Sequence, residues 1–340
     1  TLDLTLPKRA FYQLNYVPYT ALLYQTRYNN DTMALCDIFD HKKILDEYLT
    51  AFLTEKKEAL SDVNSWGTES IARLLPFIAA GKSVRGCLAL FSYDMLVKHA
   101  KVKLALPLGA GLELIHAGAL IHDDIMDGDD TRRHMKAMHI QFQNFSPDKT
   151  FGESMAINVG DLCYFLAFEQ LSFLKSSHVS QIISLASREF AAVTIAQQFD
   201  IASSYLSHQS TKDEIISLYR TKTARYTFSL PLMMGALLAN VDDKTLKTLE
   251  AFGEAAGILF QIRDDELSII GDPKKTGKPL GSDEKNHKQT LIANKTKAQI
   301  AVIKKQYEDK AVQNIQTLSI DEKHKQALME LVTFCSTRET

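Results

Sequence analysis

The sequence has few of the residues that interrupt helices. Of its 340 residues, 15 are glycine and 8 are proline, and it contains no internal repeat, low-complexity tract or linker-like segment. Long segments without these two residues favour α-helices, above all when alanine, leucine, lysine, glutamate and glutamine are plentiful. This scarcity argues against fibrous and disordered chains and predicts a largely helical globular protein.

Cysteine is also scarce and widely spaced. The four cysteines are Cys36, Cys87, Cys163 and Cys335, and no two of them have the spacing of a zinc site. Nor do they form the dense framework of a small secreted protein. We therefore expect buried free thiols and a reducing, cytoplasmic location.

Neither sign of charge dominates, and long apolar runs are missing. The formal net charge of −2 gives no general attraction to nucleic acid. No uninterrupted run of about 18 apolar residues occurs, so no transmembrane segment is expected. Apolar residues make up 45% of the chain, which is ordinary for a globular protein and enough for a large core.

What the sequence does contain is an aspartate cluster at the end of an apolar segment. Residues 113–133 read E-L-I-H-A-G-A-L-I-H-D-D-I-M-D-G-D-D-T-R-R, with five aspartates in eight positions. At 100° per residue, Asp123 and Asp127 share one helix face, and His116 lies on that face too. Carboxylates this close repel one another unless a cation lies between them. With Asp124 beside them, their oxygens suit Mg²⁺, which keeps some water ligands and takes others from a phosphate.

Two arginines follow the cluster. Arg132 and Arg133 carry planar guanidinium groups that match phosphate oxygens. A simpler interpretation is an acidic helix end followed by a solvated loop, since aspartate-rich turns are common. The apolar residues before the cluster weigh against it, because they indicate a buried helix whose terminal carboxylates need positive charge; they are Ala117, Ala119, Leu120 and Ile121.

Basic residues occur in two glycine-containing segments. Lys82 and Arg85 lie between Gly81 and Gly86, just before an apolar helix, where backbone amides and cations can bind an anion. A solvated basic loop is the simpler alternative for this segment taken alone. Lys278 lies in the second segment, G-D-P-K-K-T-G-K-P-L-G, which begins at residue 271.

A second predicted helix ends in an aspartate doublet. In F-Q-I-R-D-D, residues 260–265, Gln261 and Asp264 are three apart and share a helix face. Lys222 and Thr223 lie in another long helical stretch. Gln197 and Asp200 form a further pair at the same spacing, which either lines a site or lies on a helix surface.

These patterns predict an all-α fold. We expect a single bundle of about a dozen helices over residues 39–340, preceded by an N-terminal arm at residues 1–38. If the two acidic helix ends face each other across the core, Mg²⁺ between them can stabilise a departing diphosphate. Lys222 and Lys278 can add positive charge there. If the carbon that loses the diphosphate is allylic, a resonance-stabilised cation forms, and an apolar cavity would protect it from water. The first basic segment could then bind a second anionic substrate.

Taken together, these segments resemble a known family, the trans-prenyltransferases, or isoprenyl (polyprenyl) diphosphate synthases. The resemblance covers roughly residues 40–335. It rests on G-K-S-V-R at 81, the segment 113–127, R-R at 132, G-D-L at 160, Q-Q-F-D at 197, K-T-A at 222, F-Q-I-R-D-D at 260 and G-D-P-K-K-T-G-K-P-L-G-S-D at 271. Each motif is common by itself, whereas all of them in order and at the family spacing are specific.

The resemblance implies a bundle of the isoprenoid synthase type around a central active-site cavity, and a role for each matching residue. The metal ligands and catalytic carboxylates would be Asp123, Asp124, Asp127 and Asp264, holding about three Mg²⁺ ions with the bound diphosphate. The allylic diphosphate would be bound by Arg132, Lys222, Thr223, Gln261 and Lys278, with Lys222 also catalytic. Isopentenyl diphosphate would be bound by Lys82, Arg85, His116 and Arg133. The implied reaction is ionisation, 1′-4 condensation and proton loss to the departing diphosphate, usually in a homodimer.

The chain departs from the family pattern at four positions. Ser268 stands where the second aspartate motif usually has a third aspartate, Ser83 where an arginine is common, Gly86 where a proline is common, and His134 where a glycine follows the arginine pair. We expect these changes to affect substrate affinity more than reaction type. The residue five before Asp123 often forms a floor for the growing chain in this family. Here it is Gly118, which predicts a product of C20 or longer unless a bulky side chain on a facing helix replaces the floor.

Three other functions fit part of the pattern. A class I terpene cyclase shares the helical bundle and one acidic helix end, but its second metal motif typically mixes Asn, Ser and Glu. A metal phosphohydrolase would be built around His122 and Asp123, with a metal-activated water. A regulatory subunit would keep the bundle without turnover, which Ser268 and the altered basic segment allow.

Overall fold

The computed structural model describes residues 35–206, 209–270, 290–292 and 296–338. The chain divides into the units Thr1–Met33 and Ala34–Thr340, and everything below belongs to the second. The expected arm and its boundary at residue 38 therefore stay a prediction, and Lys278 lies outside the described residues.

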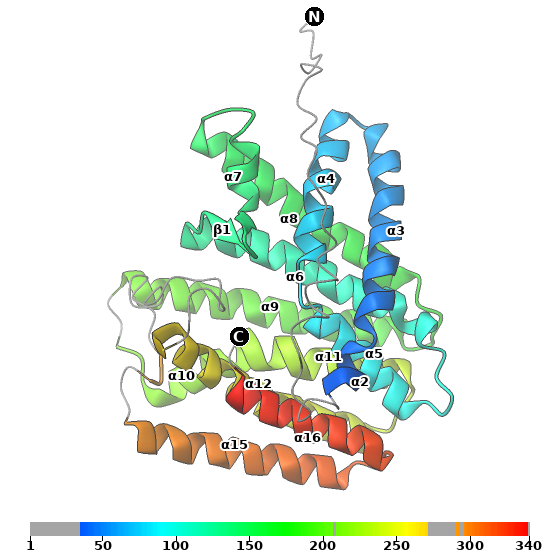
Figure 1. The fold of residues 1–340 in the computed structure, drawn as a ribbon, viewed down its shortest axis with the longest axis vertical. Helices are drawn as coiled ribbons and strands as arrows, with labels where there is room; N and C mark the ends of the chain where they lie inside the picture. Colours follow the sequence, from blue (N-terminus) through cyan, green and yellow to red (C-terminus); the bar gives the residue numbers. More distant parts are fainter. Residues whose placement is uncertain (1–34, 207–208, 271–289, 293–295, 339–340) are drawn as a thin grey trace, which may run out of the picture. The chain divides into compact units, whose positions relative to one another are not determined.

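The described residues are almost entirely helical, as predicted (Figure 1). The one sheet among them is a short antiparallel pair, β1 with β2. The elements are α2 (Leu35–Phe39), α3 (Lys42–Ser61), α4 (Ser65–Ala79), α5 (Val84–Leu96), η2 (Val102–Ala105), α6 (Leu106–Asp127), β1 (Thr131–Arg132), β2 (Met135–Lys136), α7 (Met138–Phe142), α8 (Lys149–Ser172), α9 (Val179–Tyr205), α10 (Lys212–Leu218), η3 (Tyr219–Ser229), α11 (Leu230–Leu238), α12 (Asp243–Ile270), α15 (Lys297–Thr317) and α16 (Glu322–Thr337).

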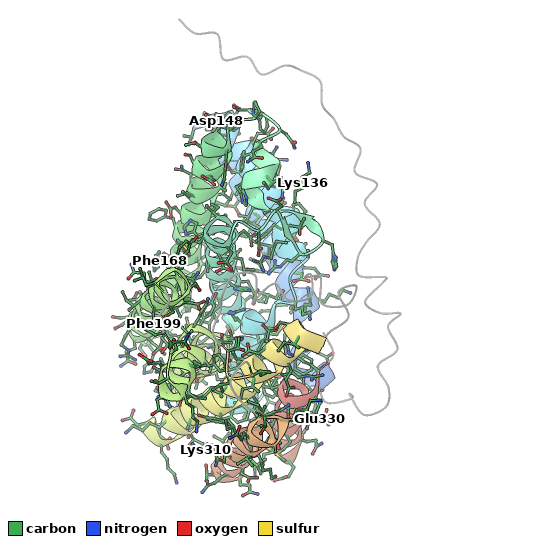
Figure 2. The ribbon with its side chains drawn as sticks, turned by 90° about the vertical axis from the view of Figure 1, so that its left-hand side faces the viewer. Lys136, Asp148, Phe168, Phe199, Lys310 and Glu330 are labelled. Carbon is green, nitrogen blue, oxygen red and sulfur yellow. The ribbon has the colours of Figure 1, made fainter. Side chains whose placement is uncertain are left out.

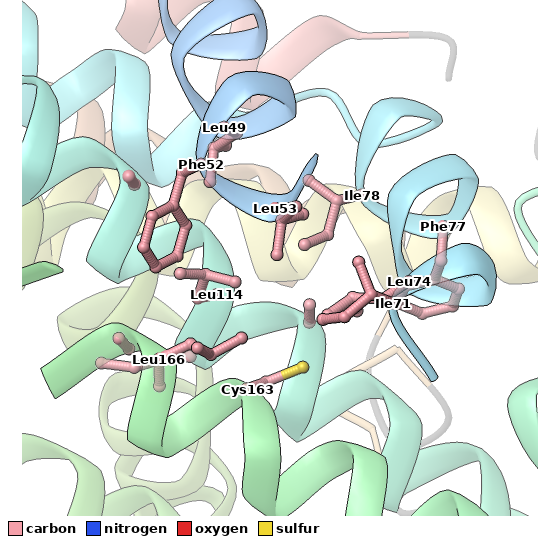
Figure 3. Packing of buried hydrophobic residues seen from close by; sticks show 14 of the residues in the cluster. Leu49, Phe52, Leu53, Ile71, Leu74, Phe77, Ile78, Leu114, Cys163 and Leu166 are labelled. Atoms are coloured by element: carbon pink, nitrogen blue, oxygen red, sulfur yellow. The ribbon is translucent and has the colours of Figure 1, made fainter. Parts of the chain in front are cut away.

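Helix α6 is the centre of the bundle. Nearly all of its residues from Leu106 to Ile121 are buried, because α6 packs against α3, α4, α5, α7, α8 and α11. Figure 3 shows one side of this packing, where Leu114 of α6 lies among apolar residues of α3, α4 and α8. Each such side chain contributes about 1.5–3 kcal/mol when it is fully buried. The core thus fixes α6 rigidly and carries its acidic end to a defined place.

By length and composition alone, the stretch Val102–Asp127 could cross a membrane, and so could α4 and α5 together, which are bent by 65°. Of the apolar window in Val102–Asp127, 72% is buried inside the protein. A helix that is apolar on all sides is expected at the centre of a large bundle. The search for uninterrupted apolar runs did not find this stretch, because isolated charged residues interrupt it.

Local sequence explains most helix ends. Thr211 and Thr296 begin α10 and α15 with capping boxes to Glu214 and Gln299. Gly128, in the left-handed region with φ of 66°, ends α6. Asn64 accepts the Trp66 N–H at 2.9 Å and so caps α4, which begins at Ser65.

Two prolines lie inside helical segments. Pro76 does not end its helix, because α4 continues through it to Ala79. Pro231 lies just after the junction between η3, a π-helix, and α11. The Leu230 N–H donates to Arg225 O, five residues back, and this wide turn precedes a proline that has no N–H to donate. The π-helix carries Lys222 and Thr223 into the site.

Candidate active site

The aspartate cluster forms the last turn of α6, and Arg132 lies on it. Arg132 Nε donates to Asp124 Oδ1 at 2.5 Å. Its Nη2 lies 3.2 Å from Asp129 Oδ2 and 3.6 Å from Asp123 Oδ2. The hairpin β1–β2 places Arg132 against the end of α6. The residues of its turn, Arg133 and His134, have positive φ. The sequence pattern identified these charges but did not predict this hairpin.

Asp124 differs from its neighbours because it is fully buried. Its Oδ2 has no hydrogen-bond partner. Burial raises the pKa of Asp124 to about 6, although Arg132 opposes the shift. Asp123 and Asp127 are only half-buried. The cluster therefore holds more negative charge than one guanidinium neutralises, and its hard oxygen atoms suit Mg²⁺. Asp123 and Asp127 are therefore accessible to a metal ion, whereas Asp124 is buried beneath them.

Helix α9 forms the side of the site next to this cluster. Gln197 Nε2 donates to Asp123 Oδ1 at 3.1 Å. Three residues further along α9, Asp200 forms an ion pair with Lys222 of η3. The pair Gln197 and Asp200 thus lines the site, one of the two interpretations that the sequence left open.

The π-helix η3 is joined in turn to α12. Thr223 Oγ1 donates to Gln261 Oε1 at 2.7 Å, and Gln261 Nε2 donates to Asp265 Oδ1 at 2.8 Å. Separate polar contacts therefore join α6 to α9, α9 to η3, and η3 to the end of α12, and together they are called the polar network here. The second aspartate of the doublet is buried in this network, while Asp264 is 56% exposed.

An arginine at the end of α16 lies on Asp264. Arg338 Nη2 donates to Asp264 Oδ1 at 2.6 Å, and its guanidinium carbon lies 3.7 Å from the centre of the Phe260 ring. The Arg338 carbonyl oxygen accepts from Arg263 Nε at 2.7 Å. A guanidinium thus lies on each acidic helix end. Among the described residues, no three His, Cys, Asp or Glu side chains form a ready-made metal cage.

The basic residues that the sequence singled out gather next to α6. Arg85 Nη2 donates to Thr227 Oγ1 at 2.6 Å, and its guanidinium lies 4.1 Å from the centre of the Tyr226 ring. The Tyr226 hydroxyl is 3.0 Å from His116 Nδ1. Burial, followed by the charges of Arg85 and Arg133, holds the pKa of His116 well below its usual value. His116 is therefore neutral at physiological pH and serves as a hydrogen-bonding group.

Arg133 belongs to this basic cluster, whereas Lys82 lies nearer the end of α12. Arg133 Nη1 donates to Phe77 O at 2.5 Å. A Cβ at Gly81 would lie 2.9 Å from that same Nη1, so a side chain there would displace the guanidinium. Burial, followed by the charge of Arg338, lowers the pKa of Lys82, and Asp264 opposes this shift. Lys82 is thus within electrostatic range of the α12 end, which links the basic segment to the second acidic helix end.

Buried Glu113 was missed as a member of this cluster. Its Oε1 accepts the Gly86 N–H at 2.8 Å, and burial raises its pKa against the opposing effects of Gly86, Arg85 and Arg133. A proline at position 86 has no N–H to donate. This hydrogen bond therefore excludes the proline that is common in the family at this position. A second of the four departures, Ser83, donates to Asp46 Oδ1 at 3.2 Å and adopts φ of 53°.

The structure does not support a site built on His122 together with Asp123. His122 Nε2 lies 3.1 Å from Ile157 O and packs against Gly160 of α8. Asp123 instead contacts Gln197 and Arg132. The two neighbouring side chains engage different helices, which argues against the phosphohydrolase interpretation.

Below the aspartates, α6 and α8 approach closely at Gly118. A Cβ at this position would lie 2.8 Å from Gly160 O and 3.0 Å from Tyr164 Cε1. Atoms of α8 therefore fill the space beside Gly118 that a side chain on α6 would otherwise occupy. Tyr164 is the bulky side chain on a facing helix that the sequence analysis allowed for.

Fold and site together define an all-α protein with two acidic helix ends and a basic cluster around one polar network. The sequence pattern of the polyprenyl synthetase family matches residues 69–332. The chain belongs to this family.

Individual relatives agree. The chain is 35% identical over 215 residues to a short chain isoprenyl diphosphate synthase of Methanocaldococcus jannaschii, covering 63% of this chain and 62% of that one. It is 32% identical to the farnesyl diphosphate synthase of Bacillus subtilis, covering 71% and 83%. A geranylgeranyl pyrophosphate synthase from Corynebacterium glutamicum, solved with isoprenyl diphosphate and magnesium, superposes with a TM-score of 0.78 at 25% identity, covering 89% and 99%.

Proposed function

We propose that the protein is a Mg²⁺-dependent prenyltransferase that condenses an allylic diphosphate with isopentenyl diphosphate to give a longer trans-polyprenyl diphosphate. One observation carries the proposal: polar contacts join the elements that carry both acidic helix ends, with Lys82 near Asp264 and Arg85 near His116. The carboxylates of the two helix ends form an acidic group, and the arginines near His116 form a basic group. A condensation of two different diphosphates needs two distinct binding sites, so that each substrate binds at its own site.

The acidic group binds the allylic substrate in this proposal. Asp123, Asp127 and Asp264 hold Mg²⁺, with about three ions when diphosphate is present, and bound Mg²⁺ supplies positive charge that stabilises the leaving diphosphate. Arg132 and Lys222 contribute cations that need no metal, as does Lys278. The guanidinium groups of Arg132 and Arg338 lie on these carboxylates, which supports a site that attracts cations. The bond between C1 and oxygen breaks and leaves an allylic cation.

The basic group binds isopentenyl diphosphate in the same proposal. Lys82, Arg85 and Arg133 bind its phosphates, and neutral His116 donates or accepts a hydrogen bond there. The alkene of this substrate attacks C1, a carbon–carbon bond forms, and a proton passes to the departing diphosphate. Tyr226, whose pKa burial raises to about 12, stays uncharged between the two groups.

In this proposal the ring of Tyr164 on α8, not a side chain at residue 118, limits a product of C20 or longer, and the protein is a homodimer. Exposed apolar side chains on α8 support the second point, because Ile157, Phe165 and Phe168 lie on one face at helical spacing. In Figure 2, Phe168 and Phe199 of α9 lie at the same edge of the view. The expected cytoplasmic location remains a prediction.

A single assay tests the activity. Purified protein with Mg²⁺ is incubated with allylic diphosphates of several chain lengths, one at a time. Each incubation is run with and without isopentenyl diphosphate. The proposal expects isopentenyl diphosphate to be consumed and a longer diphosphate to appear. Products from the allylic diphosphate alone would indicate a terpene cyclase, and no turnover of either substrate would indicate a regulatory subunit.

A further inference from the structure

Arg225 ties the π-helix η3 to two neighbouring helices at once. Its Nε donates to Glu189 Oε2 at 2.8 Å and its Nη2 donates to Glu189 Oε1 at 2.7 Å, so the contact with α9 is bidentate. The same Nη2 lies 2.8 Å from Glu250 Oε1 of α12, and Nη1 lies 3.8 Å from Glu254 Oε2. The side chain of Glu189 is only 6% exposed. One guanidinium therefore joins η3 to α9 and α12, both of which carry residues of the site.

The Arg225 guanidinium is not part of the substrate site. It lines a separate cavity of about 290 Å³ between α12 and α15, which also includes Lys247 and Tyr307. Lys222 pairs with Asp200 of α9, and residues 189 and 200 are about 16 Å apart along that helix. Arg225 can therefore act on a substrate only through the backbone that it shares with Lys222.

That backbone has a form that needs support. π-helices are rare and usually one turn long, yet η3 covers the 11 residues Tyr219–Ser229. Arg225 also takes part in the wide turn, because its carbonyl oxygen accepts the Leu230 N–H. On the α12 side, a Cβ at Gly257 would lie 2.3 Å from Ala224 Cα. This close contact has no direction and leaves η3 free to rotate about its axis, whereas the ion pairs of Arg225 are directional.

We propose that Arg225 is a positioning residue that fixes the rotation of η3 and so holds Lys222 at the substrate site. The inference rests on the proposed function, in which Lys222 binds the allylic diphosphate. Each residue of an α-helix advances by about 100° around the axis, and a residue in a wider turn advances by less. Relaxation of η3 toward an α-helix would therefore rotate Lys222 relative to α9 and take its ammonium out of the site.

The first test is the variant Arg225→Met, which removes the guanidinium and keeps an apolar stem. Isothermal titration calorimetry with Mg²⁺ and a non-ionisable allylic thiolodiphosphate is expected to show binding weaker by about 10-fold or more. KM for isopentenyl diphosphate is expected to stay within about 3-fold of wild type. A loss of folded protein alone would lower the number of active sites without weakening one substrate selectively.

Arg220→Met is the matched control. Arg220 is also on η3 and its Nε donates to Glu254 Oε1 of α12 at 2.7 Å, but it precedes Lys222 and lies outside the bidentate contact with α9. Binding of the thiolodiphosphate to this variant is expected within about 3-fold of wild type. A loss as large as that of Arg225→Met would show that any ion pair of η3 has the same effect, which overturns the proposal.

A double-variant cycle tests whether the effect passes through Lys222. Lys222→Met is expected to weaken binding by about 10-fold. Adding Arg225→Met should then cost less than about 3-fold more, because no ammonium is left to be positioned. Losses that multiply would overturn the proposal, as would an Arg225→Met variant that binds like the wild type.

Glu189→Gln gives the same test if Arg225→Met does not fold, since it keeps the size of the side chain and weakens the bidentate contact. It is expected to weaken thiolodiphosphate binding by at least about 3-fold, and thermal melting checks that each variant is folded. Wild-type affinity in folded Glu189→Gln would also overturn the proposal. Wild-type protein that does not consume isopentenyl diphosphate would instead overturn the proposed function.

Discussion

Gly118 of α6 faces the ring of Tyr164 on α8: a Cβ at position 118 would lie 3.0 Å from Tyr164 Cε1. The sequence places the floor for the growing chain at residue 118, and the structure finds the bulky group on the other helix. Substituting Gly118 with phenylalanine is a poor test of chain length, because any side chain there also collides with Gly160 O at 2.8 Å.

Tyr164→Ala is therefore the informative substitution. Removal of the ring opens space beside Gly118, so the account expects the longest product to increase by at least one five-carbon unit. Chromatography of the dephosphorylated products measures this. Tyr164→Phe keeps the ring and serves as the matched control, with the product length of the wild type. Equal product lengths for the alanine variant and the wild type would remove Tyr164 as the floor.

Arg338→Gln tests whether the arginine competes with metal for Asp264. Arg338 Nη2 lies 2.6 Å from Asp264 Oδ1, so an added Mg²⁺ ion must displace it. The variant is expected to reach half-maximal activity at an Mg²⁺ concentration lower by about 3-fold, since ion pairs with an exposed partner contribute little. Lys305→Gln, which removes an exposed ion pair with Asp309 on α15, is the control. An unchanged or higher Mg²⁺ requirement for Arg338→Gln contradicts the competition.

Glu113 predicts a dependence of stability on pH. Burial raises its pKa above the usual value of 4.5 in the folded protein. Folding is thus favoured by the protonated form, and this contribution is lost as pH rises through the raised pKa. Glu113→Gln keeps an oxygen for the Gly86 N–H and removes the charge.

The melting temperature of Glu113→Gln relative to wild type should therefore increase between pH 4 and pH 8, by about 1 to 3 °C. The comparison is made without Mg²⁺ or substrate, because binding would add its own pH dependence. A difference that is constant or falls with pH would show that Arg85 and Arg133 compensate the buried carboxylate fully.

Helical periodicity explains what the sequence alone could predict. It placed Asp123, Asp127 and His116 on one face and identified the helices that carry Gln197 and Gln261, because these relations depend only on spacing along one helix. It could not find Arg338 on Asp264 or Tyr219 on Asp265, since residues 74 and 46 positions apart meet only through tertiary packing. The π-helix was also missed, because Pro231 indicates a break but not the width of the turn before it.

Single residues show the same limit. Glu113 begins the most informative segment of the sequence, yet its role became visible only when Gly86 was found within hydrogen-bonding distance. Ser83 and Gly86 looked like weakened substrate contacts, and each instead makes a hydrogen bond to a carboxylate.

The most direct test of the central claim is whether both acidic helix ends bind the same diphosphate. Isothermal titration calorimetry with a non-ionisable allylic thiolodiphosphate, with and without Mg²⁺, is carried out on wild type, Asp123→Asn and Asp264→Asn. The account predicts Mg²⁺-dependent binding that weakens by about 10-fold or more in either variant. Binding that needs only one of the two aspartates, or none of the metal, would contradict it.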